Sequence, residues 1–151
     1  VSKHHWVIYR YAATLLTYAE SMVNAFNDVN YTDETYKYSA LWAINEVRKN
    51  ADMPLIPSMG KDEFMERLYN EWRVEFAFED HRFWDVRRWK IADTTQRELY
   101  GVKIEKQADG TFNFYKNLYE TRNWRDCMYL YPIPQSELYK NTNLNPQNTG
   151  W

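Results

Sequence analysis

Glu75 and Glu79 are the residues whose type and spacing could do chemistry, because they stand one helical turn apart in a stretch with helical periodicity. At that spacing the two carboxylates would lie on the same face of a helix. Such a pair can act as general acid and base, for example in the hydrolysis of a glycosidic bond. A glycoside hydrolase that uses these two glutamates is therefore one candidate function.

Three arginines follow the glutamates closely: Arg82, Arg87 and Arg88. A guanidinium group can bind a carboxylate bidentately and stays charged when it is buried. Nearby cations also lower the pKa of a carboxyl group, which makes it a poorer proton donor. We therefore predict that Glu75, Glu79 and the three arginines form a structural ion-pair network, and that no residue of the chain is catalytic.

The histidines and the cysteine offer no further reactive arrangement. His4 and His5 are adjacent and cannot share a helix face, His81 stands apart, and Cys127 is the only cysteine. An intrachain disulfide and a four-thiolate zinc site are therefore excluded. The 4 glycines are isolated from one another, so the chain has no glycine-rich phosphate loop. We expect neither a metal nor a cofactor.

The composition narrows the classes of partner. Lys and Arg number 19 and Asp and Glu 21, which gives a net charge of −2. Recognition of a phosphate backbone requires clustered excess cations, so no nucleic acid is expected as a partner. Aromatic residues make up 18% of the 151 residues. Rings outside the helical stripes, such as Trp42, Tyr119 and Trp124, are candidate platforms for stacking on sugars.

Apolar periodicity predicts helices over most of the first 95 residues. Apolar residues recur every three or four positions from Trp6 to Asn27, and again up to the segment 53–57, which contains two prolines. Such spacing is typical of amphipathic helices. The second helix should begin near Thr32 or Asp33, either of which can cap it, and it should bury Tyr36.

A third helix should begin after Gly60 and carry an apolar stripe that ends at Phe76. Glu79 would fall near the centre of this stripe and Glu75 at its edge. A buried carboxylate must meet a cation or become protonated, which is why a cationic partner is expected here. A turn and a short fourth helix should follow within residues 81–89.

The periodicity changes to two beyond about residue 95. Val102 and Ile104 alternate with polar residues before Asp109-Gly110, and two phenylalanines alternate after it. This pattern predicts a surface β-hairpin with a type I′ turn at Asp109-Gly110. The rest should be an irregular tail with a helical turn at 136–140 and coil from residue 141. We therefore expect a mainly α fold, with a helical part at 1–95 and a β-hairpin and extended, aromatic-rich tail at 96–151 that packs on it to form a single structural unit.

Three stretches resemble the SusD/RagB family of nutrient-binding proteins. Residues 66–89, ERLYNEWRVEFAFEDHRFWDVRRW, are similar to a late helix of the family, with ER, EF, E, R, DV and RRW in the same order. The closing YPIPQSE and NLNPQNTGW resemble the family's PIP..E and N..L.QNPGY. A weaker match covers Tyr9-Arg-Tyr-Ala12 and the pairs Ile44-Asn45 and Val47-Arg48. Asp80 stands where the family has Gly, and the terminal turn also departs from the family pattern.

The resemblance implies tetratricopeptide-like helical hairpins and a non-catalytic role. Members of the family capture oligosaccharides, or in some branches peptides, at the surface of Bacteroidetes-type bacteria. They are outward-facing, lipid-anchored proteins of the cell outer membrane that act with a SusC-like TonB-dependent transporter. Because members are several times longer, the resemblance covers only their C-terminal portion. The lipidated N-terminus and most ligand contacts would then lie upstream of Val1, and the ligand-binding residues are unknown from the sequence.

Two functions stay open beside nutrient capture. One is the glycoside hydrolase that would use Glu75 and Glu79. The other is a helical-repeat module that binds peptides or another protein.

Overall fold

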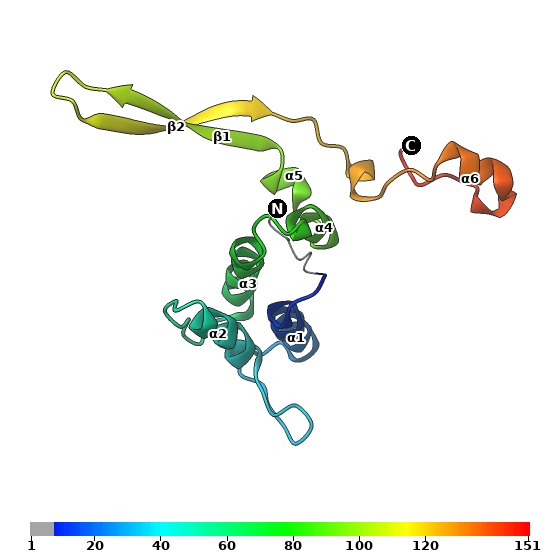
Figure 1. Cartoon of the computed structure of the whole chain (residues 1–151). Helices are drawn as coiled ribbons and strands as arrows, with labels where there is room; N and C mark the ends of the chain where they lie inside the picture. The colour runs from blue at the N-terminus through cyan, green and yellow to red at the C-terminus, as the bar shows by residue number, and fades with distance from the viewer. Residues whose placement is uncertain (1–7) are drawn as a thin grey trace, which may run out of the picture. The chain divides into compact units, whose positions relative to one another are not determined.

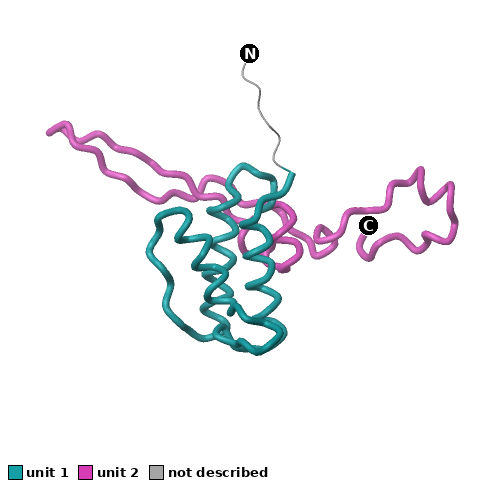
Figure 2. The backbone as a smooth tube through the Cα atoms, turned by 60° about the horizontal axis from the view of Figure 1, so that its bottom comes forward, with its two compact units in different colours: residues 1–82 teal, residues 83–151 magenta. Residues whose placement is uncertain are grey.

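The computed structural model describes residues 8–151. The chain divides into two compact units, Val1–Arg82 and Phe83–Trp151 (Figure 2). The described chain is mainly helical with a two-stranded antiparallel sheet, as predicted (Figure 1). The predicted change near residue 96 marks the passage from helices to strands, because α5 (Ala92–Thr95) precedes β1 (Glu98–Lys106). That the two predicted parts form a single structural unit stays a prediction.

Three helices build the first unit: α1 (Tyr11–Phe26), α2 (Ala40–Asn50) and α3 (Lys61–Glu75). α1 contacts both α2 and α3. Each helix buries an apolar stripe, and the largest side chains that are almost fully removed from solvent are Leu16, Val23, Ile44, Phe64 and Leu68. The burial of these side chains, at about 25 cal/mol for each Å² of apolar surface, is the main force that holds the three helices together.

The first helix begins later than predicted. Arg10 is its N-cap and has an extended backbone, with φ −128 and ψ 151, and Ile8 lies before the helix with 89% of its surface exposed. The apolar periodicity of the sequence therefore begins before the helix does, and Ile8 fits this periodicity although it is not buried. Trp6 lies outside the described residues. The helix ends as predicted at Asn27, whose φ of 56 places it in the left-handed region.

The predicted start of the second helix is wrong. Asp33 accepts hydrogen bonds from the backbone N–H groups of Thr35 at 2.8 Å and Tyr36 at 2.6 Å, and the chain then continues as a loop. The bond from the N–H of Tyr36, followed by one from the Tyr31 hydroxyl at 2.8 Å, holds the pKa of Asp33 below its ordinary value. The helix is capped instead by Ser39, and Tyr36 is 40% exposed rather than buried. A carboxylate that can cap a helix closes a turn equally well.

The third helix begins after Gly60, as predicted, and the segment before it is extended. The Asn45 side chain fixes this segment to α2, since it donates to the carbonyl of Ile56 at 3.0 Å and accepts from the N–H of Ile56 at 2.9 Å. The predicted short fourth helix is also confirmed: α4 spans His81–Arg88.

The second unit holds most of α4, then α5, the hairpin and the tail. The hairpin pairs β1 with β2 (Phe112–Thr121), and every residue of β2 is exposed, as expected for a surface hairpin. Its turn is not of type I′, which needs positive φ at both central residues. Among the residues of this turn, all of which the structure describes, only Gly110 has a positive φ. The N–H of Gly110 donates to the carbonyl of Gln107 at 3.0 Å. This is the pattern of a three-residue loop closed by a left-handed glycine.

Gly110→Ala is expected to lower the stability of the hairpin by about 1 kcal/mol. Gly110 has a φ of +89, and a Cβ at this position would meet no atom within 4 Å, so the cost is conformational alone. Gly101→Ala is the matched control, because Gly101 is equally open but has no positive φ. Hydrogen exchange of the amides in β1 and β2 measures both variants. Equal effects of the two substitutions would contradict the assignment of the loop.

The C-terminal tail is closed by side-chain amides rather than left as coil. α6 spans Gln135–Lys140, and a 3-10 turn at Thr142–Leu144 replaces part of the coil expected from residue 141. Gln147 bonds both the N–H and the carbonyl of Ile133 at 2.8 Å, and Asn148 donates to the carbonyl of Tyr131 at 2.6 Å. The closing PIP and QN stretches are thus joined to each other.

Candidate functional site

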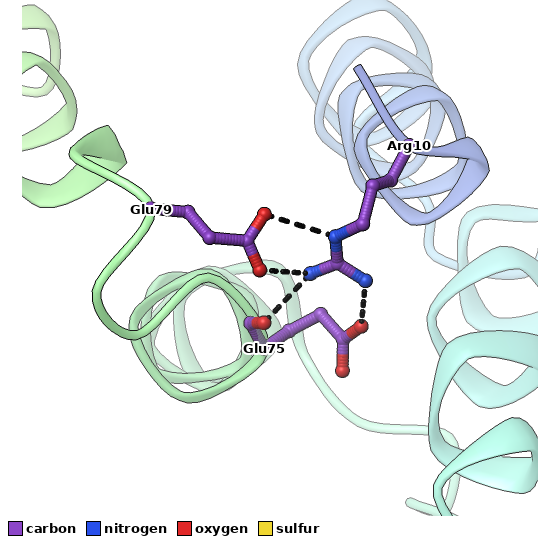
Figure 3. A network of polar contacts seen from close by, with 3 residues as sticks. All are labelled: Arg10, Glu75 and Glu79. Atoms are coloured by element: carbon purple, nitrogen blue, oxygen red, sulfur yellow. Dashed lines mark hydrogen bonds and ion pairs between the residues drawn. The ribbon is translucent and has the colours of Figure 1, made fainter. Parts of the chain in front are cut away.

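Arg10 holds both glutamates that the sequence singled out (Figure 3). Its Nη1 donates to Glu75 Oε1 at 2.7 Å, its Nε donates to Glu79 Oε2 at 3.0 Å, and its Nη2 lies 2.9 Å from Glu79 Oε1. The same Nη2 also donates to the backbone carbonyl of Glu75 at 2.7 Å. The guanidinium lies 4.4 Å from the centroid of the Phe76 ring, which adds a cation–π contact.

The end of α3 explains how the two carboxylates meet on one cation. α3 ends at Glu75, and Phe76 is its C-cap, so Glu79 lies in the following turn and not on a helical stripe as predicted. Phe78 and Asp80 on either side of Glu79 have positive φ values of 66 and 63, which reverse the chain at this point. The turn brings the Glu79 side chain back towards Arg10.

The electrostatics of this cluster favour structure over proton transfer. Burial opposes the charge of Arg10, but the hydrogen bonds that it donates to Glu75 and Glu79 and the attraction of their charges outweigh this effect, so the pKa of Arg10 is raised above its ordinary value. Both carboxylates are engaged by one permanent cation through charge-assisted hydrogen bonds. The arrangement is that of an ion-pair cluster that joins the start of α1 to the end of α3.

Two of the three predicted arginines have other contacts. Arg87 donates to the backbone carbonyl of Phe83 at 2.8 Å and stacks on the Phe83 ring at 3.6 Å, and Arg88 lies 3.4 Å from the buried carboxylate of Asp85. Both belong to the second unit, whereas Arg82 is half-buried at the end of the first. The network of five residues stays a prediction, and Arg10 is the cation that the sequence analysis did not name.

Arg10→Gln is expected to lower the free energy of unfolding by about 1–3 kcal/mol, since charge-assisted hydrogen bonds are lost and a half-buried carboxylate is left without its cation. The Glu75 side chain is only 18% exposed. Arg67→Gln is the control, because Arg67 and its partner Glu63 are 60% and 58% exposed and 3.9 Å apart. Urea unfolding followed by circular dichroism measures both. If Arg10→Gln cost no more than the control, the cluster would have no structural role.

A second ion pair was missed by the sequence analysis. Arg48 Nη1 donates to Glu71 Oε2 at 2.6 Å, and the two side chains are only 17% and 8% exposed. A signal for it was present, because Glu71 falls between Leu68 and Trp72 on the buried stripe of α3. A carboxylate in that position requires a cation.

A cavity of about 500 Å³ opens beside the Arg10 cluster. Its wall comes from the first turns of α1 and from α2, and it is lined by Arg10, Tyr11, Ala12, Leu15, Trp42, Glu46, Val47, Asn50 and Glu75. Trp42, Glu46 and Asn50 follow one another at intervals of one turn on α2. The cavity thus combines an apolar floor, aromatic rings and a few polar groups, which is the usual make-up of a small-molecule site.

The structure separates the three candidate aromatic platforms. Trp42 is 36% exposed and stacks on Tyr38 with ring centroids 4.2 Å apart. Trp124 is half-buried, with Tyr129 against it at 5.0 Å and the Arg87 guanidinium 5.6 Å from its ring. Tyr119 is 80% exposed on β2. Of the three, Trp42 combines an exposed ring with a cavity.

The other residues considered for chemistry have ordinary surroundings. His81 packs against the rings of Trp72 and Phe76, with centroids 5.5 and 4.4 Å away, and Cys127 is a half-buried free thiol. His4 and His5 lie outside the described residues. Within residues 8–151 no cluster of histidine, cysteine and acidic side chains could hold a metal ion. Nor does this part of the chain contain a helix with the length and apolar content that a membrane crossing needs.

Comparison with known proteins places the whole chain in one family. The sequence profile of the SusD family matches residues 1–151. SusD-like protein P2 of Formosa agariphila is 32% identical over 160 residues, which cover 99% of this chain and 26% of that protein.

Solved structures give the same result. A SusD-like protein from Bacteroides fragilis matches with a TM-score of 0.75 and 34% identity over 97% of this chain and 26% of its own. A SusD superfamily protein from Parabacteroides distasonis shares the fold, with a TM-score of 0.60, 23% identity and coverage of 97% and 27%. The chain spans about a quarter of the length of these relatives.

Proposed function

Because the chain belongs to the SusD family, we propose that it is part of a protein that captures oligosaccharides at the bacterial cell surface and delivers them to a SusC-like TonB-dependent transporter. The observation that carries this proposal is the match of the family over residues 1–151. The protein is placed on the outer face of the outer membrane by a lipid anchor. Members of the SusD family are in general binding proteins, and the uptake of glycans is their common role.

The contacts of Arg10 support a role without catalysis. A retaining or inverting glycosidase needs one carboxyl group that is protonated at the start of the reaction. Here Glu75 and Glu79 share one guanidinium, with N–O distances of 2.7 to 3.0 Å. This favours capture over the glycoside hydrolase.

The packing of α1 on α2 supports a tetratricopeptide-like helical hairpin as the repeating unit. The two helices are consecutive and contact each other, and both bury apolar side chains, among them Leu16, Val23 and Ile44. A hairpin of this kind also suits the alternative role of a helical-repeat module that binds a peptide or another protein.

Calorimetric titration of the intact protein with oligosaccharides, combined with product analysis, tests the proposal. We expect binding of at least one glycan with no shorter products after prolonged incubation. Release of shorter products that Glu79→Gln abolishes in a folded protein would establish the hydrolase instead. Glu137→Gln is the matched control, since the Glu137 side chain is 47% exposed and paired with Lys140 on α6.

Purification from native outer membranes tests the partner. We expect a large TonB-dependent transporter to be recovered together with the protein. Recovery of another protein in a fixed ratio, with no transporter, would favour the helical-repeat module.

A further inference from the structure

The cavity between α1 and α2 has an apolar floor and an aromatic wall. Leu15 and Val47 are buried at its base, whereas Tyr11 on α1 is 71% exposed and Trp42 on α2 is 36% exposed. One face of a sugar ring presents C–H groups, and these pack well on the flat face of an aromatic side chain. The two rings belong to different helices, so a ligand between them would contact both.

Trp42 is held in position before any ligand arrives. Its ring stacks on Tyr38 with an interplanar angle of 27°. Its own backbone N–H is bound by the Ser39 hydroxyl at 3.0 Å. A side chain that is already ordered loses little conformational freedom on binding, which increases the affinity that a given contact can provide.

Polar groups surround these rings at the spacing of a helical turn. Glu46 and Asn50 line the cavity from α2, and Glu75 and Arg10 line it from the other side. Carboxylate and amide groups form hydrogen bonds with hydroxyl groups, and a carboxylate can accept more bonds than the one that Arg10 makes to Glu75 Oε1. The lining is therefore suited to a ligand rich in hydroxyl groups.

The charge of the lining decides between neutral and acidic glycans. Two carboxylates, Glu46 and Glu75, face one cation, Arg10, and that cation is also bound to Glu79. Lys49 Nζ lies 3.8 Å from Glu46 Oε1, and the Lys49 side chain is 72% exposed. The attraction between these two charges is therefore largely screened by solvent. A sulfate or uronate group would be repelled by this lining, whereas a neutral sugar would not.

From these contacts we infer that the α1–α2 cavity is a subsite for a neutral oligosaccharide, with Trp42 as its stacking platform. This inference rests on the proposed function and adds the place and the ligand class. The volume of about 500 Å³ lies in the usual range for small-molecule sites and accommodates a short stretch of the glycan.

Calorimetric titration of the intact protein with two sets of probes tests the subsite. The neutral set is maltoheptaose, cellohexaose, xylohexaose, laminarihexaose and mannohexaose, and the acidic set is oligogalacturonate and a carrageenan oligosaccharide. We expect a neutral probe to bind, and Trp42→Ala to weaken its affinity about tenfold or more, as for an aromatic anchor that the ligand covers. Trp84→Ala should leave the affinity unchanged, because Trp84 is 61% exposed on α4 and does not line the cavity.

The outcomes separate the subsite from the proposed function. If a neutral probe binds and Trp42→Ala binds it equally well, the subsite is wrong and glycan capture stands. If only the acidic probes bind, the ligand class is wrong. If no probe binds, glycan capture itself is overturned and the subsite with it. Trp42→Phe, which keeps a ring for stacking, should lose less affinity than Trp42→Ala and serves as the readout if the alanine variant does not fold.

Discussion

Arg48→Met is expected to lower the free energy of unfolding by about 3–5 kcal/mol, the usual cost of removing one partner of a buried ion pair. The substitution removes Arg48 Nη1, which lies 2.6 Å from Glu71 Oε2. The Glu71 carboxylate, whose side chain is only 8% exposed, is then left without its cation. It also removes the bond from Arg48 Nε to the carbonyl of Pro54 at 2.8 Å. Methionine replaces the aliphatic stem of arginine and is apolar, so the loss reflects chiefly the missing charge and hydrogen bonds.

Lys49→Met is the matched control for this prediction. Lys49 is the next residue on the same helix, its side chain is 72% exposed, and its ion pair with Glu46 is 3.8 Å long. Exposed pairs of this kind contribute about 0–1 kcal/mol. Denaturant unfolding at neutral pH, followed by circular dichroism, measures both variants.

A double variant shows whether the buried charge causes the loss. Replacing both partners of a buried pair by apolar residues is often neutral, because no charge is then left without a partner. Arg48→Met combined with Glu71→Leu should therefore be clearly more stable than Arg48→Met alone. If the double variant were less stable by the sum of the two single losses, the uncompensated charge of Glu71 would not be the cause.

The elements that local periodicity determines were predicted well from the sequence. α3 begins after Gly60 and buries Phe64, Leu68 and Trp72 because one apolar stripe and an acidic first turn point to the same helix. The hairpin follows from alternation on both sides of Asp109-Gly110, and only the type of its turn was wrong. The start of α2 could not be read locally, because Asp33 and Ser39 carry the same capping chemistry and only one of them begins a helix.

Pairing between distant residues could not be predicted in the same way. The need of Glu75 for a cation is visible in the sequence, but Arg10 lies 65 residues away from it. The three arginines just downstream were nearer in sequence and equally suitable in chemistry. Which cation reaches a carboxylate depends on how α1 packs on α3, and periodicity does not contain that information.

The residues that carry the family resemblance turn out to make such distant contacts. Arg10 and Arg48 belong to the weaker upstream match, and they bind Glu75 and Glu71 of the stretch 66–89. Gln147 in the closing stretch bonds the backbone of Ile133 in the PIP segment. The matched residues therefore report on the fold, whereas the cavity residue Trp42 lies outside all three stretches. This explains why the family could be read from the sequence, whereas Trp42 was one of three candidate rings that the sequence could not tell apart.

Gly150→Ala is expected to have the second large effect. It should lower the stability of the C-terminal segment by about 2–4 kcal/mol. Gly150 has a φ of +91, and a Cβ built on it would lie 2.8 Å from Cys127 Cβ. The neighbouring atom is the first carbon of a side chain, which cannot rotate away. The alanine would displace Trp151, whose indole N–H is shared between the carbonyls of Cys127 and Leu130 at 3.0 Å each.

Substitutions at Cys127 separate the contact from the backbone strain of the Gly150 variant. Cys127→Ala keeps the Cβ, so Gly150→Ala should be as harmful in that background as in the native chain. Cys127→Gly removes the Cβ, so in that background only the conformational cost of about 1 kcal/mol should remain. Hydrogen exchange of the Trp151 indole measures the local opening in each background. If Cys127→Ala rescued the variant as well as Cys127→Gly does, the thiol would be the obstacle, and the close approach of the two Cβ positions would not explain why this turn takes a glycine.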